Sequence, residues 1–350
     1  MPLPPLPLRR LVLAPAVVLL GFVLLSILPL WLLITLAAMS MVPGRLRLPR
    51  VLWMMIFYIL WDAAALLAML GLWLASGFGW RIRSPRFQRA HYALTGAFLH
   101  VLFNQARWVL RLRIRTVGDG SSAGFLRDPN PPERPLIVAC RHAGPGDSFI
   151  LVHTLINRAH RETRIVLKDT LQWDPAIDVM LNRLPSRFIA PAPPTGPARN
   201  DRLADQVGQL ARGLDGDDAF VIFPEGGNFT PDRRLRRIDR LREDGASALA
   251  DRASAMRNVM APRTGGLFAA LDAAPDADVV FVGHTGLDRM VTVADIWREL
   301  PMDKQIVMHG WHVRAEDVPT TDQARRRWLY DWFATIDDWI DENRPLEGGP

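Results

Sequence analysis

Residues 136–157 of the chain read LIVACRHAGPGDSFILVHTLIN. The first five residues are apolar, which is typical of a buried strand, and residues 148–157 carry the apolar spacing of a helix. The glycines and the proline between them predict a tight turn. This stretch therefore predicts a strand, a turn and a helix in direct succession, which is the repeating unit of an α/β fold.

The same alternation of short apolar runs and helical patterns continues along the chain. Strands are expected at residues 136–140, 164–167, 187–190, 219–223, 279–282 and 305–308. Helices are expected at residues 148–157, 175–184, 200–214, 247–258, 265–271 and 322–341. We therefore predict an α/β fold in three layers around a largely parallel, possibly mixed sheet, with reactive groups where strands end.

Two long apolar runs precede this domain. Residues 11–42 contain no charged residue, and Asp62 is the only charged residue among residues 51–74. A helix needs about 20 residues to cross the hydrocarbon core of a membrane, so both runs are long enough. They predict an N-terminal transmembrane helical hairpin, with bends at Pro15 and Pro29 and with Asp62 facing another helix or a polar cavity. A secretory signal peptide fits less well, because its apolar region typically spans about 7–15 residues.

The arginines that flank these runs predict an orientation. The connection at residues 43–50 carries three arginines, and the outer flanks carry Arg9, Arg10, Arg81, Arg83, Arg86 and Arg89. By the positive-inside rule the outer flanks are cytoplasmic. We therefore expect an integral protein of the cell (inner) membrane, with both termini and the soluble domain in the cytoplasm.

The chain is expected to have three parts. These are a membrane anchor with two transmembrane helices at residues 1–85, an amphipathic or interfacial helix at residues 86–115, and a soluble domain at residues 116–345. The spacing at residues 86–115 fits equally well a helix that packs on the core of the soluble domain.

Composition narrows the possible partners. The formal net charge is +6, which suits an anionic membrane surface, a phosphorylated cofactor or a nucleic acid. No nucleic-acid-binding motif of recognisable spacing is present, so no nucleic acid is expected as a partner. Cys140 is the only cysteine, which excludes an intramolecular disulfide and a cysteine-rich metal site. No metal site is expected among three C-terminal histidines that lack the spacing of metal ligands, His284, His309 and His312.

A histidine and an aspartate flank the Gly-Pro-Gly turn of the first stretch. A carboxylate at Asp147 that accepts a hydrogen bond from His142 would set the tautomer of the imidazole and leave its other nitrogen free to take a proton. Asp147 fits equally well as the N-cap of the following helix. Cys140 offers a covalent nucleophile close to His142, although a buried structural cysteine is the commoner case.

A second candidate segment, residues 220–230, reads FVIFPEGGNFT. It predicts a buried strand that ends abruptly in a proline, a carboxylate and two glycines, and the glycines permit close approach of the backbone to a ligand. Glu225 could bind a substrate or brace the neighbouring loop, or it could be an ordinary polar residue at the end of a strand.

Together the two segments resemble the glycerolipid acyltransferase family, whose hallmark is H-x-x-x-x-D followed by a strand that ends in F-P-E-G. The matching residues are His142, Asp147, Phe223, Pro224, Glu225 and Gly226. Residues 261–268, APRTGGLF, resemble the P-R-T-x-G segment of the longer lysophosphatidate and lysocardiolipin acyltransferases. The resemblance spans about residues 135–319, and it implies that residues 116–345 form an acyltransferase domain.

The resemblance implies transfer of a fatty acyl group from acyl-CoA, or from an acyl carrier protein, to the hydroxyl of a lysophospholipid in the membrane. The simplest acceptor is 1-acylglycerol 3-phosphate, which gives phosphatidate, and no cofactor is implied beyond the acyl donor. His142 would act as general base, Asp147 would orient it, and Glu225 and Gly226 would contact substrate. A metal-dependent hydrolase with His142, Asp147 and Glu225 as ligands, and a non-catalytic membrane protein, are the alternatives from other classes.

The chain departs from the family pattern where the acceptor is bound. The family usually has an asparagine where this chain has Arg141, an arginine for the acceptor phosphate where it has Pro191, and threonine-arginine where it has Gly227-Asn228. We therefore expect phosphate contacts from other cations at probable strand ends or loops, namely Arg187, Arg263 and Lys168. The departures leave a glycolipid or phosphoinositide acceptor open. An arginine-rich run at residues 233–242 fits either a phosphate site or a solvated helix face.

Overall fold

The computed structural model describes residues 3–38, 47–117, 134–144, 146–189, 197–286 and 305–345. The chain forms two compact units. In the described residues, the first unit holds residues 3–38, 47–112 and 167–189, and the second holds the rest.

Between residues 3 and 110, the described part of the first unit is built from helices. In chain order they are α1 (Leu6–Leu8), the short π-helix η1 (Arg9–Leu13), α2 (Ala14–Ser26), α3 (Leu28–Ala38), α4 (Arg47–Ala75) and α5 (Pro85–Leu110). Pro15 is the second residue of α2 and Pro29 is the second residue of α3, so the chain changes helix at both expected bends. This position suits proline, because the first turn of a helix needs no N–H from it.

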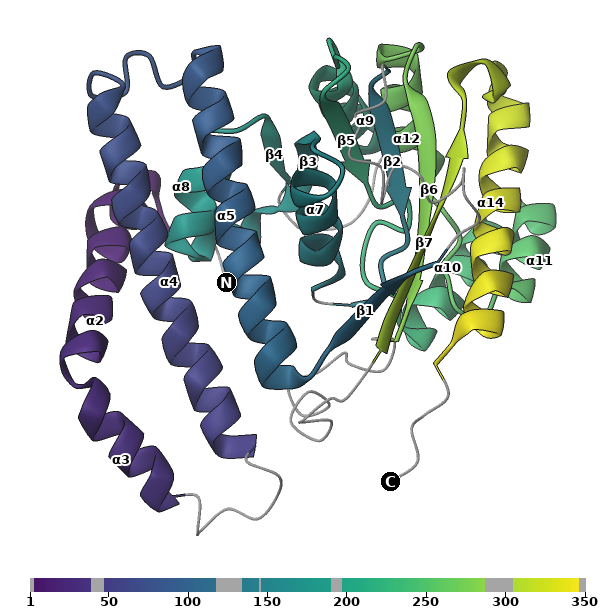
Figure 1. Ribbon diagram of the computed structural model, residues 1–350. Coiled ribbons are helices and arrows are strands. Elements are labelled where there is room, and N and C mark those ends of the chain that lie inside the picture. Colours follow the sequence, from purple (N-terminus) through teal and green to yellow (C-terminus); the bar gives the residue numbers. More distant parts are fainter. Residues whose placement is uncertain are drawn as a thin grey trace. The chain divides into compact units, whose positions relative to one another are not determined.

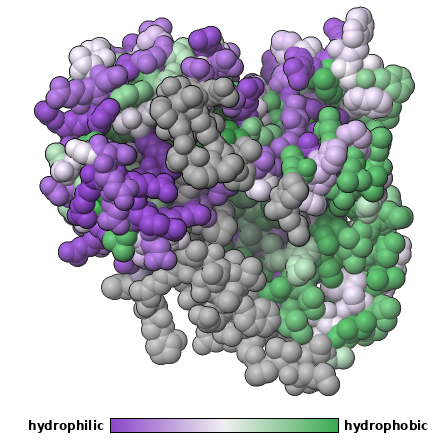
Figure 2. All heavy atoms as spheres, turned by 180° about the vertical axis from the view of Figure 1, so that it is seen from behind, coloured by the Kyte–Doolittle hydropathy of each residue, from purple (hydrophilic) through white to green (hydrophobic). Residues whose placement is uncertain are grey.

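Helices α2 and α4 pack together in close contact. A side chain at Gly21 would place its Cβ only 2.8 Å from the Cβ of Ala63, so the two helices approach where both residues are small. Among the described residues, Leu6–Ser26 and Leu48–Ala75 are long and apolar enough to cross a membrane, by length and composition. Figure 2 shows hydrophobic side chains gathered over this part of the chain, and Leu11, Leu19 and Leu33 are among those that lie exposed.

Polar contacts join a short helix of the first unit to these apolar helices. Helix α8 (Pro175–Leu181) is capped by Asp174, whose carboxylate accepts a hydrogen bond from the hydroxyl of Tyr58. Asp62 is buried beside Asp174, which agrees with the expectation that it faces another element rather than lipid. Within the first turn of α8, Asp178 accepts an ion pair from the N-terminal segment, with Arg9 Nη1 2.5 Å from Asp178 Oδ1.

Helix α5 packs along α4 within the same unit. The ring nitrogen of Trp61 donates to the carbonyl of Phe98 at 3.0 Å, and the two aromatic rings stack with their centroids 6.2 Å apart. Helix α5 covers most of the predicted segment 86–115, but it ends at Leu110, and residues 113–116 form a strand. An interfacial location of this helix stays a prediction.

A seven-stranded sheet is formed by the described residues, in the order β1-β7-β6-β2-β5-β3-β4 (Figure 1). The strands are β1 (Arg113–Thr116), β2 (Leu136–Cys140), β3 (Glu162–Lys168), β4 (Ser186–Ile189), β5 (Asp218–Ile222), β6 (Asp278–Thr285) and β7 (Gln305–Val313). Neighbours β1 and β7, β2 and β5, β2 and β6, and β3 and β5 run parallel, whereas β6 and β7 run antiparallel. The prediction of a largely parallel, mixed α/β sheet is confirmed.

Among the described residues, the α-helices of the second unit are α7 (Asp147–Asn157), α9 (Pro197–Ala211), α10 (Pro231–Glu243), α11 (Ser247–Ala255), α12 (Thr264–Ala273) and α14 (Asp322–Asn343). The crossover from β2 to β3 through α7 runs along the sheet opposite to the crossover from β5 to β6 through α12. Because such crossovers are right-handed, the two helices cover opposite faces of the sheet. The central strands β2, β5 and β6 are buried along their whole length, as expected for strands covered on both faces.

Candidate active site

His142 and Asp147 meet at the carboxyl end of β2. His142 follows the strand by two residues, and Asp147 is the first residue of α7. Between them Gly146 adopts φ 109°, a left-handed conformation that side chains disfavour, and this lets the chain reverse towards the helix. His142 Nδ1 lies 2.9 Å from Asp147 Oδ2 and 3.2 Å from Oδ1. The side chain of His142 is 15% exposed, so its ring remains accessible to a reactant.

Asp147 is held by the turn as well as by the histidine. Its carboxylate accepts backbone N–H bonds from Ala143 at 2.8 Å, Gly144 at 3.1 Å and Ser148 at 2.6 Å. The N-cap of α7 is Gly146, so simple helix capping does not describe the role of Asp147. Burial alone would raise the pKa of Asp147, but contacts from His142 and His284 outweigh it and hold the pKa well below its usual range. The carboxylate is therefore ionised at neutral pH and suited to stabilise an imidazolium.

Glu225 braces the histidine loop from the neighbouring strand. It lies in the turn that follows β5 and is fully buried. Its Oε1 accepts the backbone N–H of His142 at 2.7 Å, and its Oε2 accepts the backbone N–H of Met260 at 2.9 Å. Through these contacts Glu225 holds the backbone of His142 and Met260 in place. Direct contact between Glu225 and a substrate stays a prediction.

Burial raises the pKa of Glu225 to about 7, although the charge of Arg141 and the two backbone donors act in the opposite direction. Between the ordinary pKa of 4.5 and about 7, the folded chain therefore holds a proton that the unfolded chain has released. The contribution of this residue to the free energy of unfolding is fully present below the lower value. It is lost as the pH rises through the higher one, a fall of up to about 3 kcal/mol.

We expect Glu225→Gln to lose this part of the pH dependence, because an amide does not titrate. The measurement is denaturant unfolding of the wild type and the variant at pH 5 and pH 8. The wild type should lose more stability between these pH values than the variant, and equal losses in both would contradict a raised pKa at Glu225.

The two sequence motifs meet because β2 and β5 are parallel neighbours. The ring of Phe223 lies 4.6 Å, centroid to centroid, from the ring of His142. On the other side of the turn, the carbonyl of His142 accepts the N–H of Phe229 at 2.7 Å. The second motif and the residues after it therefore contact His142 through the ring of Phe223, the carboxylate of Glu225 and the backbone N–H of Phe229.

Three arginines gather around the turn at residues 225–228. A side chain at Gly226 would come within 3.1 Å of Arg263 Nε, so the glycine leaves room for this guanidinium. Arg237 Nη2 lies 3.4 Å from the carbonyl of Glu225, and Arg233 Nη1 donates to the carbonyl of Asn228 at 3.2 Å. Burial, followed by the charge of Arg263, lowers the pKa of Arg237 to about 10. This concentration of positive charge beside the histidine suits a phosphate group.

The arginine-rich run thus has two faces. Arg233 and Arg237 lie one helical turn apart at the start of α10 and reach the 225–228 turn. Three other members of the run are exposed, namely Arg236, Arg240 and Arg242. A solvated helix face therefore describes these three residues, and a phosphate site formed by Arg233 and Arg237 stays a prediction.

Lys168 and Arg187 are placed differently from the other predicted phosphate ligands. Lys168 is the last residue of β3, Arg187 lies in β4, and both side chains are exposed. Both belong to the first unit, whereas His142, Gly226 and Arg263 belong to the second. Their part in substrate binding stays a prediction, and Pro191 lies outside the described residues.

Cys140 does not have the environment of a nucleophile. Its side chain is fully buried, and burial raises the pKa of the thiol well above its usual range. Its Sγ lies 3.1 Å from the carbonyl oxygen of Arg141. A buried structural cysteine is therefore the better description.

The carboxylates of the site do not resemble metal ligands. Asp147 and Glu225 each use both oxygens to accept hydrogen bonds, almost all from backbone N–H groups. Among the described residues, no group of three or more His, Cys, Asp or Glu side chains is arranged to hold a metal ion. The oxygens of both carboxylates are therefore already engaged in hydrogen bonds of the fold.

Arg141 and His284 are two site residues whose importance the sequence alone did not reveal. Arg141 is fully buried behind the histidine and donates to the carbonyls of His284 at 2.6 Å and Asn258 at 2.8 Å. His284 lies at the end of β6, with its Nε2 3.6 Å from Asp147 Oδ2. A signal was present in the sequence, because the apolar run of β6 ends in Gly-His much as the run of β2 ends in Arg-His.

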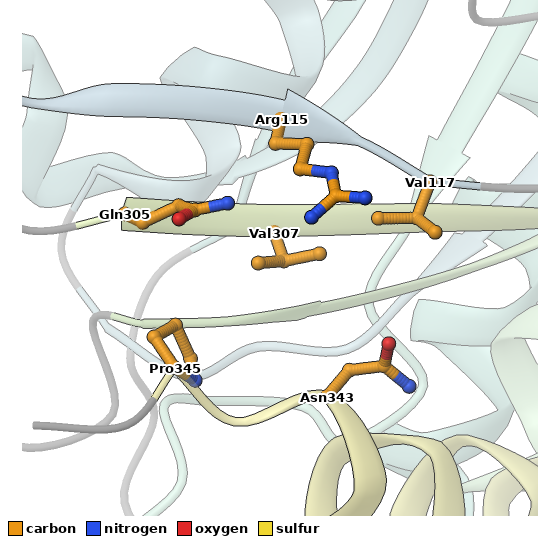
Figure 3. A pocket seen from close by; sticks show the side chains of 6 residues that line it. All are labelled: Arg115, Val117, Gln305, Val307, Asn343 and Pro345. Carbon is orange, nitrogen blue, oxygen red and sulfur yellow. The ribbon is translucent and has the colours of Figure 1, made fainter.

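A separate hollow lies elsewhere in the second unit, at the sheet edge formed by β1 and β7. Figure 3 shows the guanidinium of Arg115 beside the side chains of Val117 and Val307 in this pocket. Its other lining residues are Gln305, Asn343 and Pro345. None of the motif residues lines it.

Comparison with known families agrees with the geometry. Residues 126–285 match the family model described as Acyltransferase, a range that begins before β2, ends with β6 and includes both motifs. No curated protein matches the chain in sequence.

Proposed function

We propose that this acyltransferase domain moves a fatty acyl group from acyl-CoA to the hydroxyl of a lysophospholipid, most simply 1-acylglycerol 3-phosphate, to give phosphatidate. The observation that carries the proposal is the accessible His142 ring, whose Nδ1 bonds an ionised Asp147 beside an arginine-lined turn. Such a histidine is suited to remove a proton from a hydroxyl.

The reaction is a direct transfer. His142 Nε2 removes the proton of the acceptor hydroxyl as its oxygen attacks the thioester carbonyl, and Asp147 stabilises the imidazolium that forms. The tetrahedral intermediate then collapses, its carbon–sulfur bond breaks, and the thiol leaves with the proton that His142 had taken. The new ester remains on the lipid, and no acyl-enzyme forms.

The N-terminal helices would hold the enzyme at its substrate. The acceptor is a membrane lipid, and the two long apolar helices are of the length and composition that suit a bilayer. We place the enzyme in the cell (inner) membrane with its acyltransferase domain in the cytoplasm, where acyl-CoA or acyl carrier protein is the donor and the anionic lipid surface attracts its arginines.

The test is an assay of the purified protein with radiolabelled acyl-CoA and a panel of lysophospholipids, glycolipids and phosphoinositides. We expect labelled phosphatidate from 1-acylglycerol 3-phosphate, at a rate that an excess of chelator does not change. A preference for a glycolipid or a phosphoinositide would change the acceptor named in the proposal but not the proposed reaction, acyl transfer. Release of coenzyme A without any acylated lipid, or inhibition by chelator, would contradict the proposal.

Arg263→Lys should weaken binding of a phosphorylated acceptor. Lysine keeps the charge but loses the fork of the guanidinium, so the KM for the acceptor should rise about 10-fold with little change in kcat. We expect Arg187→Lys to act in the same direction if β4 contributes to the site. Arg242→Lys is the matched control, because Arg242 is an exposed arginine whose ion pair is with Asp239. If Arg263→Lys and Arg187→Lys both leave this KM unchanged for every phosphorylated acceptor, the head group is held elsewhere or carries no phosphate.

A further inference from the structure

A second histidine, His284, lies close to the Asp147 carboxylate of the His142–Asp147 pair. His284 is the seventh residue of β6, which is the parallel neighbour of β2 on the side away from β5. Its side chain is only 4% exposed, so it is not placed to meet a substrate. The two histidines approach the same carboxylate from different strands, since His142 Nδ1 and His284 Nε2 lie 2.9 Å and 3.6 Å from Asp147 Oδ2.

The position of His284 is set by reciprocal contacts with Arg141. The guanidinium of Arg141 donates to the carbonyl of His284 at 2.6 Å, and His284 Nε2 lies 3.2 Å from the carbonyl oxygen of Arg141. The backbone N–H of Arg141 also donates to the carbonyl of Val282 at 3.0 Å. These bonds tie the end of β6 to the residue that immediately precedes His142.

The surroundings of His284 Nε2 determine where its proton lies. This nitrogen faces two oxygen atoms, the carbonyl of Arg141 and Oδ2 of Asp147, and both can only accept hydrogen bonds when Asp147 is ionised. An unprotonated Nε2 would place its lone pair against both oxygens. Nε2 therefore carries a hydrogen, which bonds the carbonyl of Arg141 and contributes a favourable electrostatic contact to Asp147.

We infer that His284 is a positioning residue for acyl transfer, which fixes the Asp147 carboxylate in the orientation that bonds His142. Oδ2 is the atom that it contacts, and the same atom bonds His142 Nδ1 and the N–H of Ala143. A group that restrains Oδ2 of Asp147 therefore also restrains His142, which is bonded to that oxygen. The inference rests on the proposed function, because the reaction in which His284 acts is acyl transfer.

The competing interpretation is that His284 only fills space between β2 and β6. Two substitutions separate the interpretations. In His284→Gln the amide nitrogen can occupy the place of Nε2 and donate, whereas in His284→Leu a side chain of similar bulk has no donor. A packing role should tolerate leucine at least as well as glutamine, and a positioning role should tolerate only glutamine.

A matched control is available on the adjacent strand. His309 in β7 is also buried and its ring nitrogen meets a carbonyl, that of Val117 at 2.6 Å, but its ring packs on Trp311 and Trp339. His309→Leu removes the same kind of bond from another buried histidine and should leave kcat unchanged.

The experiment measures kcat and both KM values of the full-length protein in detergent, with thermal unfolding as a check on folding. We expect His284→Leu to lower kcat about 10-fold without changing either KM, as a misplaced catalytic group would. His284→Gln should retain at least about a third of the wild-type kcat. In an Asp147→Asn background His284→Leu should change the residual kcat less than about 2-fold, because residues that act through one group are not additive.

A spectroscopic readout separates failure of this inference from failure of the proposed function. In protein labelled with ¹⁵N-histidine, the ring N–H signal of His142, identified by its loss in His142→Ala, should shift in His284→Leu and stay in place in His284→Gln and His309→Leu. If the wild type transfers no acyl group, the proposed function fails and this signal still decides the role of His284. A folded His284→Leu with unchanged kcat, an unmoved His142 signal, or glutamine no better than leucine would overturn the inference.

Discussion

His142→Ala is expected to abolish acyl transfer, with kcat reduced by about 10²–10⁴ in a protein that still folds. The reason is that the proton of the attacking hydroxyl would have no acceptor at the position now held by Nε2. The fold should survive, because the ring is partly exposed and its main-chain contacts to Glu225 and Phe229 do not involve the side chain. The measurement is turnover of labelled acyl-CoA together with thermal unfolding.

The chain offers a matched control for this variant. His312 Nε2 lies 2.9 Å from Asp278 Oδ2, so a second His–Asp pair exists in the same unit with the same separation. His312→Ala should leave kcat within about 2-fold of the wild type, because surface substitutions away from a site have small effects. Near-native turnover in folded His142→Ala would refute the role of His142 as base.

Asp147→Asn is expected to lower kcat by about 10²–10⁴ as well, because an amide can hold the ring but cannot stabilise the imidazolium charge. The amide nitrogen replaces one of the two oxygens and cannot accept, so either the N–H of Ser148, now bonded to Oδ1, or those of Ala143 and Gly144, now bonded to Oδ2, lose their acceptor. Each buried donor left without a partner costs about 1–3 kcal/mol, so the variant should also unfold at lower temperature.

Both effects are measured on the same sample, kcat by turnover and stability by thermal unfolding. Asp278→Asn is the control, since Asp278 also bonds a histidine and the backbone N–H of Ala315. It should lose stability but keep kcat. Wild-type turnover in Asp147→Asn would show that the carboxylate serves the fold alone.

The sequence predicts the central sheet well because its strands are continuous apolar runs bounded by turns. Strand β1 escapes this rule, since residues 113–116 read RIRT with only one apolar residue, and its place depends on pairing with β7 far along the chain. Helix α10 is not among the helices expected from apolar spacing, and a helix face was only one of two interpretations of its arginines. It is so rich in charge that only Ile238 is buried, and an apolar stripe is what a helix prediction needs.

The site residues likewise divide into those placed by local sequence and those placed by contacts between distant parts of the chain. His142 and Asp147 are five residues apart across one turn, so their meeting follows from local structure alone. The bracing role of Glu225 and the position of His284 depend on which strands flank β2, and that order becomes visible only in the folded sheet. The arginines around the 225–228 turn are only partly predictable from the sequence. Helical spacing relates Arg233 to Arg237, but it does not show that Arg263 lies near them.

Direct transfer from thioester to lipid, with His142 as base, is tested most directly by a single-turnover reaction. The enzyme in excess over radiolabelled acyl-CoA is mixed with 1-acylglycerol 3-phosphate and quenched over time, and label is followed in acyl-CoA, lipid, free fatty acid and protein. We predict that label passes from acyl-CoA to phosphatidate with equal release of coenzyme A and without labelled protein, and that His142→Ala stops both. Label that accumulates on the protein before the lipid, or that appears as free fatty acid alone, would contradict the account.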